Sequence, residues 1–208
     1  MQVVRRLSLA LDELHQGIKP MSGTFYLHED EWGMVELLPV ENMVEREVVV
    51  EEAKQFGQDH STGVGWTDIY MIPEAHHSIA ERHIPLAELR ALIASWLPEA
   101  DTVQSGYSTY VEALQHSFAF GNRASRTGVF YGNYEGSTIT QINIIGPDEE
   151  VEAKITLFAE ALCALGERYN LMLADWWSDF TVDLRDRAAV TSYLRGDADK
   201  QEDSEPKA

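Results

Sequence analysis

Cysteine, long apolar runs and positive charge are all scarce in this sequence of 208 residues. The single Cys163 cannot form an internal disulfide, and it lies in an apolar, helix-like stretch. No apolar run approaches the roughly 18 to 20 residues that a membrane-spanning helix needs. Near the N-terminus, Asp12 and Glu13 interrupt the apolar residues well before the length of a secretory signal is reached. We therefore expect a cytoplasmic protein that does not contact membranes.

The charge is strongly one-sided, with 35 acidic against 16 basic residues and a net charge of −19. Such a surface repels phosphate backbones and anionic lipids and attracts basic proteins, so we expect a basic protein partner and no nucleic acid. Glu29–His60 has ten acids and two bases, Asp148–Asp186 has ten acids and three bases, and the tail Arg195–Ala208 has five acids and three bases. The first two stretches are expected to supply most of the field. Whether they share one face stays open at this point.

Motifs that bind cofactors or activate nucleophiles are missing as well. Gly63-Val-Gly65 lacks the third glycine of a dinucleotide fingerprint, and it precedes an expected strand instead of opening a helix. The sequence has no Walker-type Gly-Lys-Ser, and Gly106-Tyr-Ser108 is not followed by the glycine of a nucleophile elbow. We therefore expect no cofactor and no serine nucleophile.

One loop is rich in groups that bind metals. The segment Glu74-Ala-His76-His77-Ser-Ile-Ala-Glu81-Arg-His83 gathers three histidines and two glutamates within ten residues. It contains neither His-Glu-x-x-His nor a cysteine pair, and no second His or Cys cluster elsewhere completes a tetrahedral site. We interpret it as an exposed polar loop. A metal site or a pH-sensitive contact remain the alternatives.

Four aspartates recur at intervals of three or four residues near the end of the chain: Asp175, Asp179, Asp183 and Asp186. They could line one end of a hairpin and serve as acid and base, or as oxygen ligands of a divalent cation. The other interpretation is a solvated rim of turn residues. We prefer it because a catalytic pair needs a pocket and a raised pKa, which a sequence does not display.

Hydrophobic periodicity predicts the helices and strands. Apolar residues at alternating steps of four and three predict an amphipathic helix over Asp148–Tyr169, with its acidic first turn at 148–150 and a left-handed stop at Asn170. Further helices are expected over Val3–His15, Leu86–Leu97 and Asp186–Leu194. Asn42–Phe56 is ambiguous, because Val48-Val-Val50 favours a strand whereas Val49, Ala53 and Phe56 give a helical stripe, and we prefer the helix. Strands are expected over Gly23–His28, Met34–Leu38, Trp66–Ile72, Asp101–Gly106, Thr127–Tyr134, Ser137–Ile145, Leu171–Trp176 and Phe180–Leu184.

The order of these elements predicts the fold class. Gly23–His28 and Met34–Leu38 should form one hairpin, closed by Gly33, and Thr127–Ile145 should form another. Hairpins separated by helices, without strict alternation, indicate an α+β fold with a mainly antiparallel sheet and two or three amphipathic helices packed on it. We expect 1–194 to form a single acidic domain and 195–208 a disordered polar tail.

Two clusters combine tryptophan with acids. Consecutive Trp176 and Trp177 on a strand point to opposite sides, so one of them is a candidate exposed anchor unless both are covered. Tryptophan among acids is typical of a hot spot for a basic partner, because the ring gives desolvated contact and the charges steer association. The predicted partner-binding residues are Glu29, Asp30, Glu31 and Trp32 in the first cluster, and Asp175, Trp176, Trp177 and Asp179 in the second.

In general character the chain resembles the immunity proteins of bacterial polymorphic-toxin systems, and so does its ending, Leu171-Met-Leu-Ala-Asp-Trp176-Trp-Ser-Asp-Phe-Thr-Val-Asp-Leu184 before a short helix. Those proteins are small, single-domain, often acidic α+β proteins that block a toxin by binding it. The resemblance implies an inhibitor and not an enzyme, with an acidic face that occupies the basic cleft of a toxin. Two alternatives remain: a small enzyme that uses carboxylates or a divalent metal near Asp175–Asp186 or His76–His83, and an acidic adaptor or structural protein.

Overall fold

The computed structural model describes residues 23–107, 110–122, 124, 126–148 and 150–197. The expected helix Val3–His15 lies outside the described residues, and so does the expected tail from residue 198 onward. The described chain has an α+β fold with mainly antiparallel sheets, which confirms the predicted fold class. Within these ranges, no helix is long and apolar enough to cross a membrane.

Six strands form the main sheet, in the order β5-β6-β7-β2-β8-β9, and each neighbouring pair is antiparallel. The strands are β2 (Val35–Pro39), β5 (Ser117–Gly121), β6 (Val129–Glu135), β7 (Thr138–Ile145), β8 (Leu171–Asp175) and β9 (Thr181–Asp183). The predicted β6–β7 hairpin is confirmed, with Gly136 at a positive φ of 60° in its turn. The predicted strands β8 and β9 are confirmed as well, and they pair with each other.

A second, smaller sheet contains β1 (Thr24–His28), β3 (Thr102–Tyr107) and β4 (Tyr110–Ala113). β1 pairs in parallel with β3, so the predicted hairpin between β1 and β2 is wrong. The short helix η1 (Glu29–Glu31) turns the chain from one sheet to the other. Its capping box holds this turn: the Glu31 carboxylate accepts a hydrogen bond of 2.8 Å from the His28 backbone N–H.

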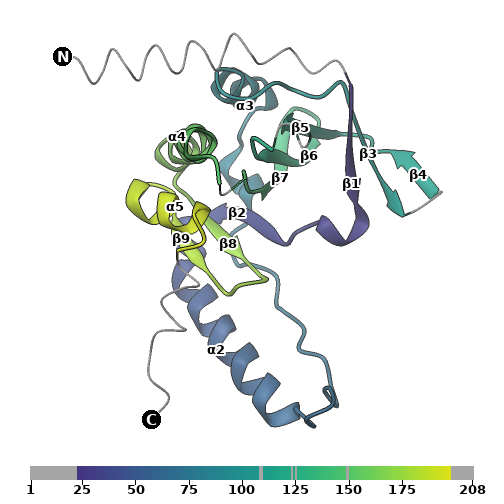
Figure 1. The fold of residues 1–208 in the computed structure, drawn as a ribbon, viewed down its shortest axis with the longest axis vertical. Coiled ribbons are helices and arrows are strands. Elements are labelled where there is room, and N and C mark those ends of the chain that lie inside the picture. Colours follow the sequence, from purple (N-terminus) through teal and green to yellow (C-terminus); the bar gives the residue numbers. More distant parts are fainter. Residues whose placement is uncertain (1–22, 108–109, 123, 125, 149, 198–208) are drawn as a thin grey trace.

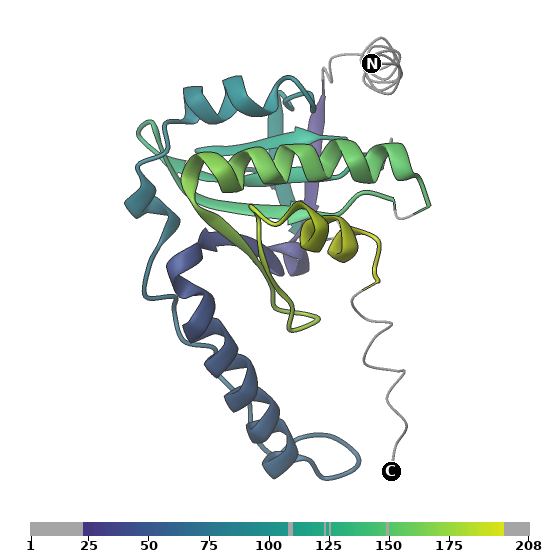
Figure 2. The same cartoon turned by 90° about the vertical axis from the view of Figure 1, so that its left-hand side faces the viewer.

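Three helices cover one face of the main sheet: α3 (Leu86–Ile93), α4 (Glu152–Tyr169) and α5 (Arg187–Leu194) (Figures 1 and 2). All three confirm predicted helices. α4 begins at Glu152, so the expected acidic first turn at 148–150 is wrong and only Glu152 is an acid of that turn. The helix ends at Asn170 with φ 57°, as expected. Asp186 caps α5 by accepting hydrogen bonds from two backbone N–H groups, both at 3.0 Å.

The main core lies between these helices and the sheet, where phenylalanines of β5, β6 and α4 meet aliphatic residues of α3 and β7. On the opposite face, β1 and β3 cover the β5–β6 end, and Phe25, Leu27 and Val103 pack there against Tyr131. The β2–β8 end of that face has a smaller cluster, formed by Leu38, Met172 and Ala174. The two ends of this face are therefore covered by different parts of the chain.

The long helix α2 (Met43–His60) projects from the body, and the chain returns alongside it (Figure 2). We call residues 43–76 the arm. Its helix confirms the one predicted over Asn42–Phe56. The strand predicted over Trp66–Ile72 is wrong, because in the described chain this segment pairs with no strand and has only an isolated bridge between Ser61 and Trp66. An extended segment needs such a neighbour for its backbone hydrogen bonds.

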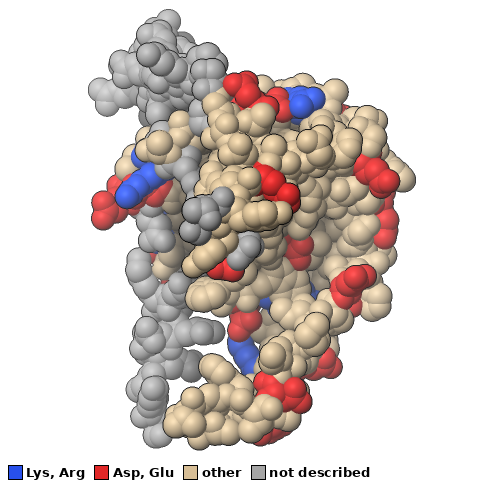
Figure 3. Space-filling model, turned by 90° about the vertical axis from the view of Figure 1, so that its right-hand side faces the viewer, with Lys and Arg blue, Asp and Glu red and all other residues tan. Residues whose placement is uncertain are grey.

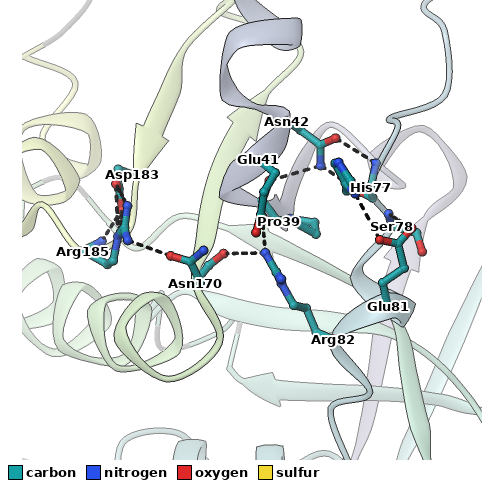
Figure 4. Close-up of polar contacts among 10 residues, drawn as sticks. All are labelled: Pro39, Glu41, Asn42, His77, Ser78, Glu81, Arg82, Asn170, Asp183 and Arg185. Atoms are coloured by element: carbon teal, nitrogen blue, oxygen red, sulfur yellow. Dashed lines mark hydrogen bonds and ion pairs between the residues drawn. The ribbon is translucent and has the colours of Figure 1, made fainter.

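The base of the arm is closed by buried Asn42, which ends the short helix η2 (Val40–Asn42). Its amide nitrogen donates to the carbonyls of Pro39 (3.1 Å) and His77 (2.8 Å), and its oxygen accepts from the His77 N–H (3.0 Å) (Figure 4). Arg82, at the end of η3 (Ile79–Arg82), bonds to Glu41 and to the backbone carbonyl of Asn170. Both ends of the arm are thus fixed to the body.

Candidate functional site

Asp175, one of the predicted partner-binding acids, is buried at the end of β8 and organises the turn to β9. Its Oδ1 accepts hydrogen bonds from the backbone N–H groups of Trp177 (2.9 Å) and Ser178 (3.2 Å). Its Oδ2 accepts from the hydroxyls of Ser178 (2.6 Å) and Tyr193 (2.8 Å). With four donors on one carboxylate, Asp175 holds the hairpin and α5 together, and only 7% of the residue is exposed.

Trp176 is half-buried and lies between a base and an acid. The Arg46 guanidinium sits 3.8 Å from the centre of its ring, and the indole N–H donates to Glu36 Oε1 at 2.6 Å. Arg46 itself is buried and donates to the Asp175 carbonyl at 3.1 Å. Burial lowers the pKa of the Arg46 guanidinium, and the nearby charges of Asp179, Asp175 and Glu36 oppose this shift. The two predicted acidic stretches therefore meet around Arg46, through α2, β2 and β8.

Trp177 and Asp179 lie at the tip of the β8–β9 hairpin, and both are exposed. Trp177 is 82% exposed, so the two consecutive tryptophans differ in their surroundings. Asp179 adopts a left-handed conformation with φ 60°. Of the second predicted cluster, these two residues are the ones with exposed side chains.

The first predicted cluster lies at η1 and belongs mostly to the packing of the small sheet. The Trp32 ring meets Tyr131 edge-on at 5.3 Å, and its indole N–H donates to Ser105 Oγ at 3.2 Å. The Tyr131 hydroxyl donates to the Glu31 carbonyl. Asp30 is exposed, whereas the side chain of Glu29 lies outside the described part of the structure. Trp32 is therefore a partly buried structural residue that packs against Tyr131.

The arm gathers most of the exposed apolar side chains, a feature that sequence reasoning missed. Of the eleven large apolar side chains that are exposed in the described chain, seven belong to the arm: Val44, Val48, Val64, Trp66, Ile69, Met71 and Ile72. Trp66, Ile69 and Met71 are 72%, 79% and 81% exposed. The sequence signal for this surface was the apolar segment 66–72, which was predicted as a strand but has no sheet to pack on.

A groove of about 670 Å³ runs between α2 and the returning segment of the arm. Phe56 lines it and stacks on His60, with ring centres 4.0 Å apart. Tyr70 closes it by donating a hydrogen bond to Glu52 at 3.1 Å. Trp66 and Ile69 also line the groove. The arm thus presents an apolar groove and an apolar rim to solvent.

The charge of the arm is negative and unbalanced. It contains seven acids against two bases, and one of those bases is the buried Arg46. Among the described residues, no Arg or Lys forms an ion pair with an acid of the arm, whereas the body has seven pairs between arginines and acids. Figure 3 shows acidic side chains on both the body and the arm, with few basic ones beside them.

A cleft of about 740 Å³ lies where the arm joins the body, on the face of the main sheet opposite α4 (Figure 3). Glu36, Leu38, Gln141 and Trp176 line the cleft on the side of the body. The end of the arm, with Glu74, lines the opposite side. β2 and β7 pair in register only at Glu36 and Asn143, so the strands separate beside the cleft. Burial raises the pKa of the Glu36 carboxyl, while the Trp176 hydrogen bond and the Arg46 charge oppose this shift.

Asn143 lies next to Glu36 and is fully buried. Directly paired residues of antiparallel strands project from the same face, with Cβ atoms about 5 Å apart. In the described structure, neither the Asn143 amide nitrogen nor its oxygen has a hydrogen-bond partner. A buried amide without partners is rare and points to a water molecule or ligand atom beside it.

The groups considered for catalysis are scattered and engaged. Asp183 pairs with Arg185, whose hydrogen bond lowers the pKa of the Asp183 carboxyl, and Asp186 caps α5. His76 contacts Glu45 at 2.6 Å and His77 contacts Glu81 at 3.2 Å. His83 ends η3 in a left-handed conformation with φ 48°. Among the residues described, no group of three His, Cys, Asp or Glu side chains could hold a metal ion.

Cys163 lies in α4 and is buried against the main core. Burial raises the pKa of its thiol, which favours the unreactive protonated form. Comparisons of the chain with protein-family models, with curated proteins and with solved structures gave no match.

Proposed function

We propose that this chain is a binding protein of the immunity type, which neutralises a basic toxin by direct contact. The observation that carries the proposal is the arm, where exposed apolar side chains and uncompensated acids occur together. The arm is the main contact surface, and Trp177 at the hairpin tip is a second one. The catalytic centre of the toxin, being basic, is the surface that the acidic arm would occupy.

The energetics of such a contact favour tight binding. Burial of one large apolar side chain contributes about 1.5–3 kcal/mol, and an aromatic anchor at the centre of an interface contributes about 2 kcal/mol or more. Trp66, Ile69 and Met71 are mostly exposed in the free protein, so nearly all of their apolar surface remains for a partner to cover. The surrounding acids would speed association without being buried themselves.

The experiment uses the gene next to the one that encodes this chain, since immunity and toxin genes are adjacent. Its product is expressed in bacteria with and without this protein, and growth and co-purification are measured. We expect the neighbouring product to be toxic alone and harmless when the two are expressed together. A product without toxicity, or one that this protein does not bind, would contradict the proposal.

Surface variants locate the contact. Trp66→Ser together with Met71→Ser should abolish protection without lowering thermal stability, because both side chains are exposed. Tyr110→Ser is the matched control, since Tyr110 is 76% exposed on β4, outside the arm. Association rates should fall by about tenfold or more from low to high salt. An unchanged rate would exclude electrostatic steering.

A further inference from the structure

We propose that the cleft between the arm and the main sheet is a receptor site for a guanidinium group, held by Glu36 and Glu74 and stacked against Trp176. We assign this guanidinium group to an arginine side chain of the basic partner, and this assignment rests on the proposed function. A free guanidinium compound has the same chemistry, and the experiment below separates the two sources.

The charge of the cleft selects a cation. Glu36 and Glu74 both line it, and the described lining includes no Lys or Arg. Glu36 Oε1 is occupied by the Trp176 indole, which fixes the orientation of the carboxylate. A guanidinium could then bond the second oxygen in a charge-assisted contact, which is about twice as strong as a neutral hydrogen bond.

Planar donors suit this site better than an ammonium. A guanidinium has five N–H donors in one plane, and it stacks on aromatic rings. Trp176 already stacks with one guanidinium, that of Arg46, at 3.8 Å from the ring centre. Further acceptors lie at the floor and rim, namely the Thr140 hydroxyl, the Gln141 amide and the Ser78 hydroxyl. Asn143, whose amide has no partner in the described structure, pairs with Glu36 in the sheet but is buried and does not line the cleft.

The size and walls of the cleft fit a side chain with an apolar stem. Its volume of about 740 Å³ lies within the range of ligand sites. Leu38, Ile72, Pro73 and Ile79 line it and give the methylene groups of an arginine an apolar surface to contact. The acids provide the charge contact and the aliphatic residues provide the contact for the stem.

The test uses N-butylguanidinium as the probe and N-butylurea as its neutral isostere. The full chain is labelled with ¹⁵N, and the indole N–H signal of Trp176 is identified as the one that Trp176→Phe removes. We expect butylguanidinium to shift this signal in a saturable way and butylurea to bind at least about tenfold more weakly. Equal shifts with both compounds, or no saturable shift with butylguanidinium, would overturn the proposal.

Two variants with the same change of charge make the test specific. Glu36→Gln keeps an oxygen for the Trp176 indole but removes the charge, so butylguanidinium should bind about tenfold more weakly. Glu47→Gln removes an exposed acid of α2 that does not line the cleft, and it should bind as the wild type does. If the two variants bound alike, Glu36 would not be the counter-charge and the proposal would fail.

Competition distinguishes the two sources of the group. If butylguanidinium slows binding of the toxin, the cleft receives an arginine of the partner. If the probe binds but does not compete, the cleft is a site for a free guanidinium compound. If the toxin binds and the probe does not, the cleft proposal is overturned while the proposed function stands.

Discussion

Removal of the Asp175 carboxylate should unfold the β8–β9 hairpin, although the sequence suggested a contact residue at this position. The carboxylate accepts four hydrogen bonds, from Trp177, Tyr193 and twice from Ser178. It also lies close to the buried charge of Arg46, whose guanidinium bonds the Asp175 carbonyl. Asp175→Ala leaves all four donors without their acceptor.

The size of the effect follows from the position of each donor. A hydrogen bond to a charged group contributes about 1.5–3 kcal/mol, and water recovers part of this where the donor is accessible. All four bonds to the Asp175 carboxylate are partly buried, so water replaces the lost acceptor only in part. We expect Asp175→Ala to lower the free energy of unfolding by about 2–4 kcal/mol. Asp175→Asn keeps one carbonyl oxygen as an acceptor and should cost about 1–2 kcal/mol.

Urea unfolding followed by far-ultraviolet circular dichroism measures these differences. The control is Asp179→Asn, which removes a charge near Arg46 at an exposed, left-handed position that asparagine tolerates. It should stay within about 0.5 kcal/mol of the wild type. If Asp175→Ala were as harmless as the control, the carboxylate would not organise the turn. A binding defect of Asp175→Ala is therefore to be interpreted together with its stability.

Three further predictions concern a carboxyl, two glycines and the base of the arm. Burial raises the pKa of Glu36, so the protonated carboxyl stabilises the folded state at low pH, and this contribution is lost as pH rises above about 4.5 through the folded pKa. Glu36→Gln should therefore stabilise the protein more at neutral pH than near pH 4, as measured by urea unfolding. Gly166→Ala should lower the melting temperature because an added Cβ would overlap Leu184, whereas Gly57→Ala in α2 meets open space and should raise stability by up to about 1 kcal/mol. Asn42→Ala should make the arm the first site of limited proteolysis, and an unchanged cleavage pattern would show that other contacts hold its base.

Local patterns in the sequence predicted most elements of the fold. The apolar period of α4, the prolines around α3 and the β-branched and aromatic residues of β6 and β7 act over neighbouring residues, so the sequence displays them directly. The stop at Asn170 is local as well, because asparagine tolerates the left-handed conformation found there. In these elements, the apolar face that the sequence pattern reveals is also the face that packs against the core.

Pairing between distant strands could not be predicted in this way. The closeness of β1 and β2 in the sequence favoured a hairpin, but β1 pairs with β3, and Phe25 lies opposite Val103. That register depends on the packing of Phe25, Leu27 and Val103 against Tyr131, which no short window contains. The strand predicted over 66–72 failed for the related reason that a strand needs a neighbour for its backbone hydrogen bonds.

The candidate site was predictable in part. An acid within the apolar run Met34-Val-Glu-Leu-Leu38 is a signal that could have indicated Glu36, since a carboxyl on a buried strand needs partners. Arg46 gave no such signal, because a base among the acids of a helix is usually a surface residue. Its burial against Trp176 depends on the placement of α2 beside the β8–β9 hairpin.

The distribution of ion pairs changes the meaning of the net charge. Surface pairs between arginines and acids contribute only about 0–1 kcal/mol each to stability, so their main effect here is to neutralise charge locally. The seven pairs of the described body cancel charge where they lie, and Glu160 with Arg187 is an example. In the described arm, no Arg or Lys pairs with an acid, His76 contacts Glu45, and Arg46 is buried at the base. Salt screens exposed charges beyond a Debye length of about 10 Å, so a partner meets the negative charge of the arm once it comes within about that distance. The apolar side chains of Trp66 and Met71 lie where that field would bring a basic partner.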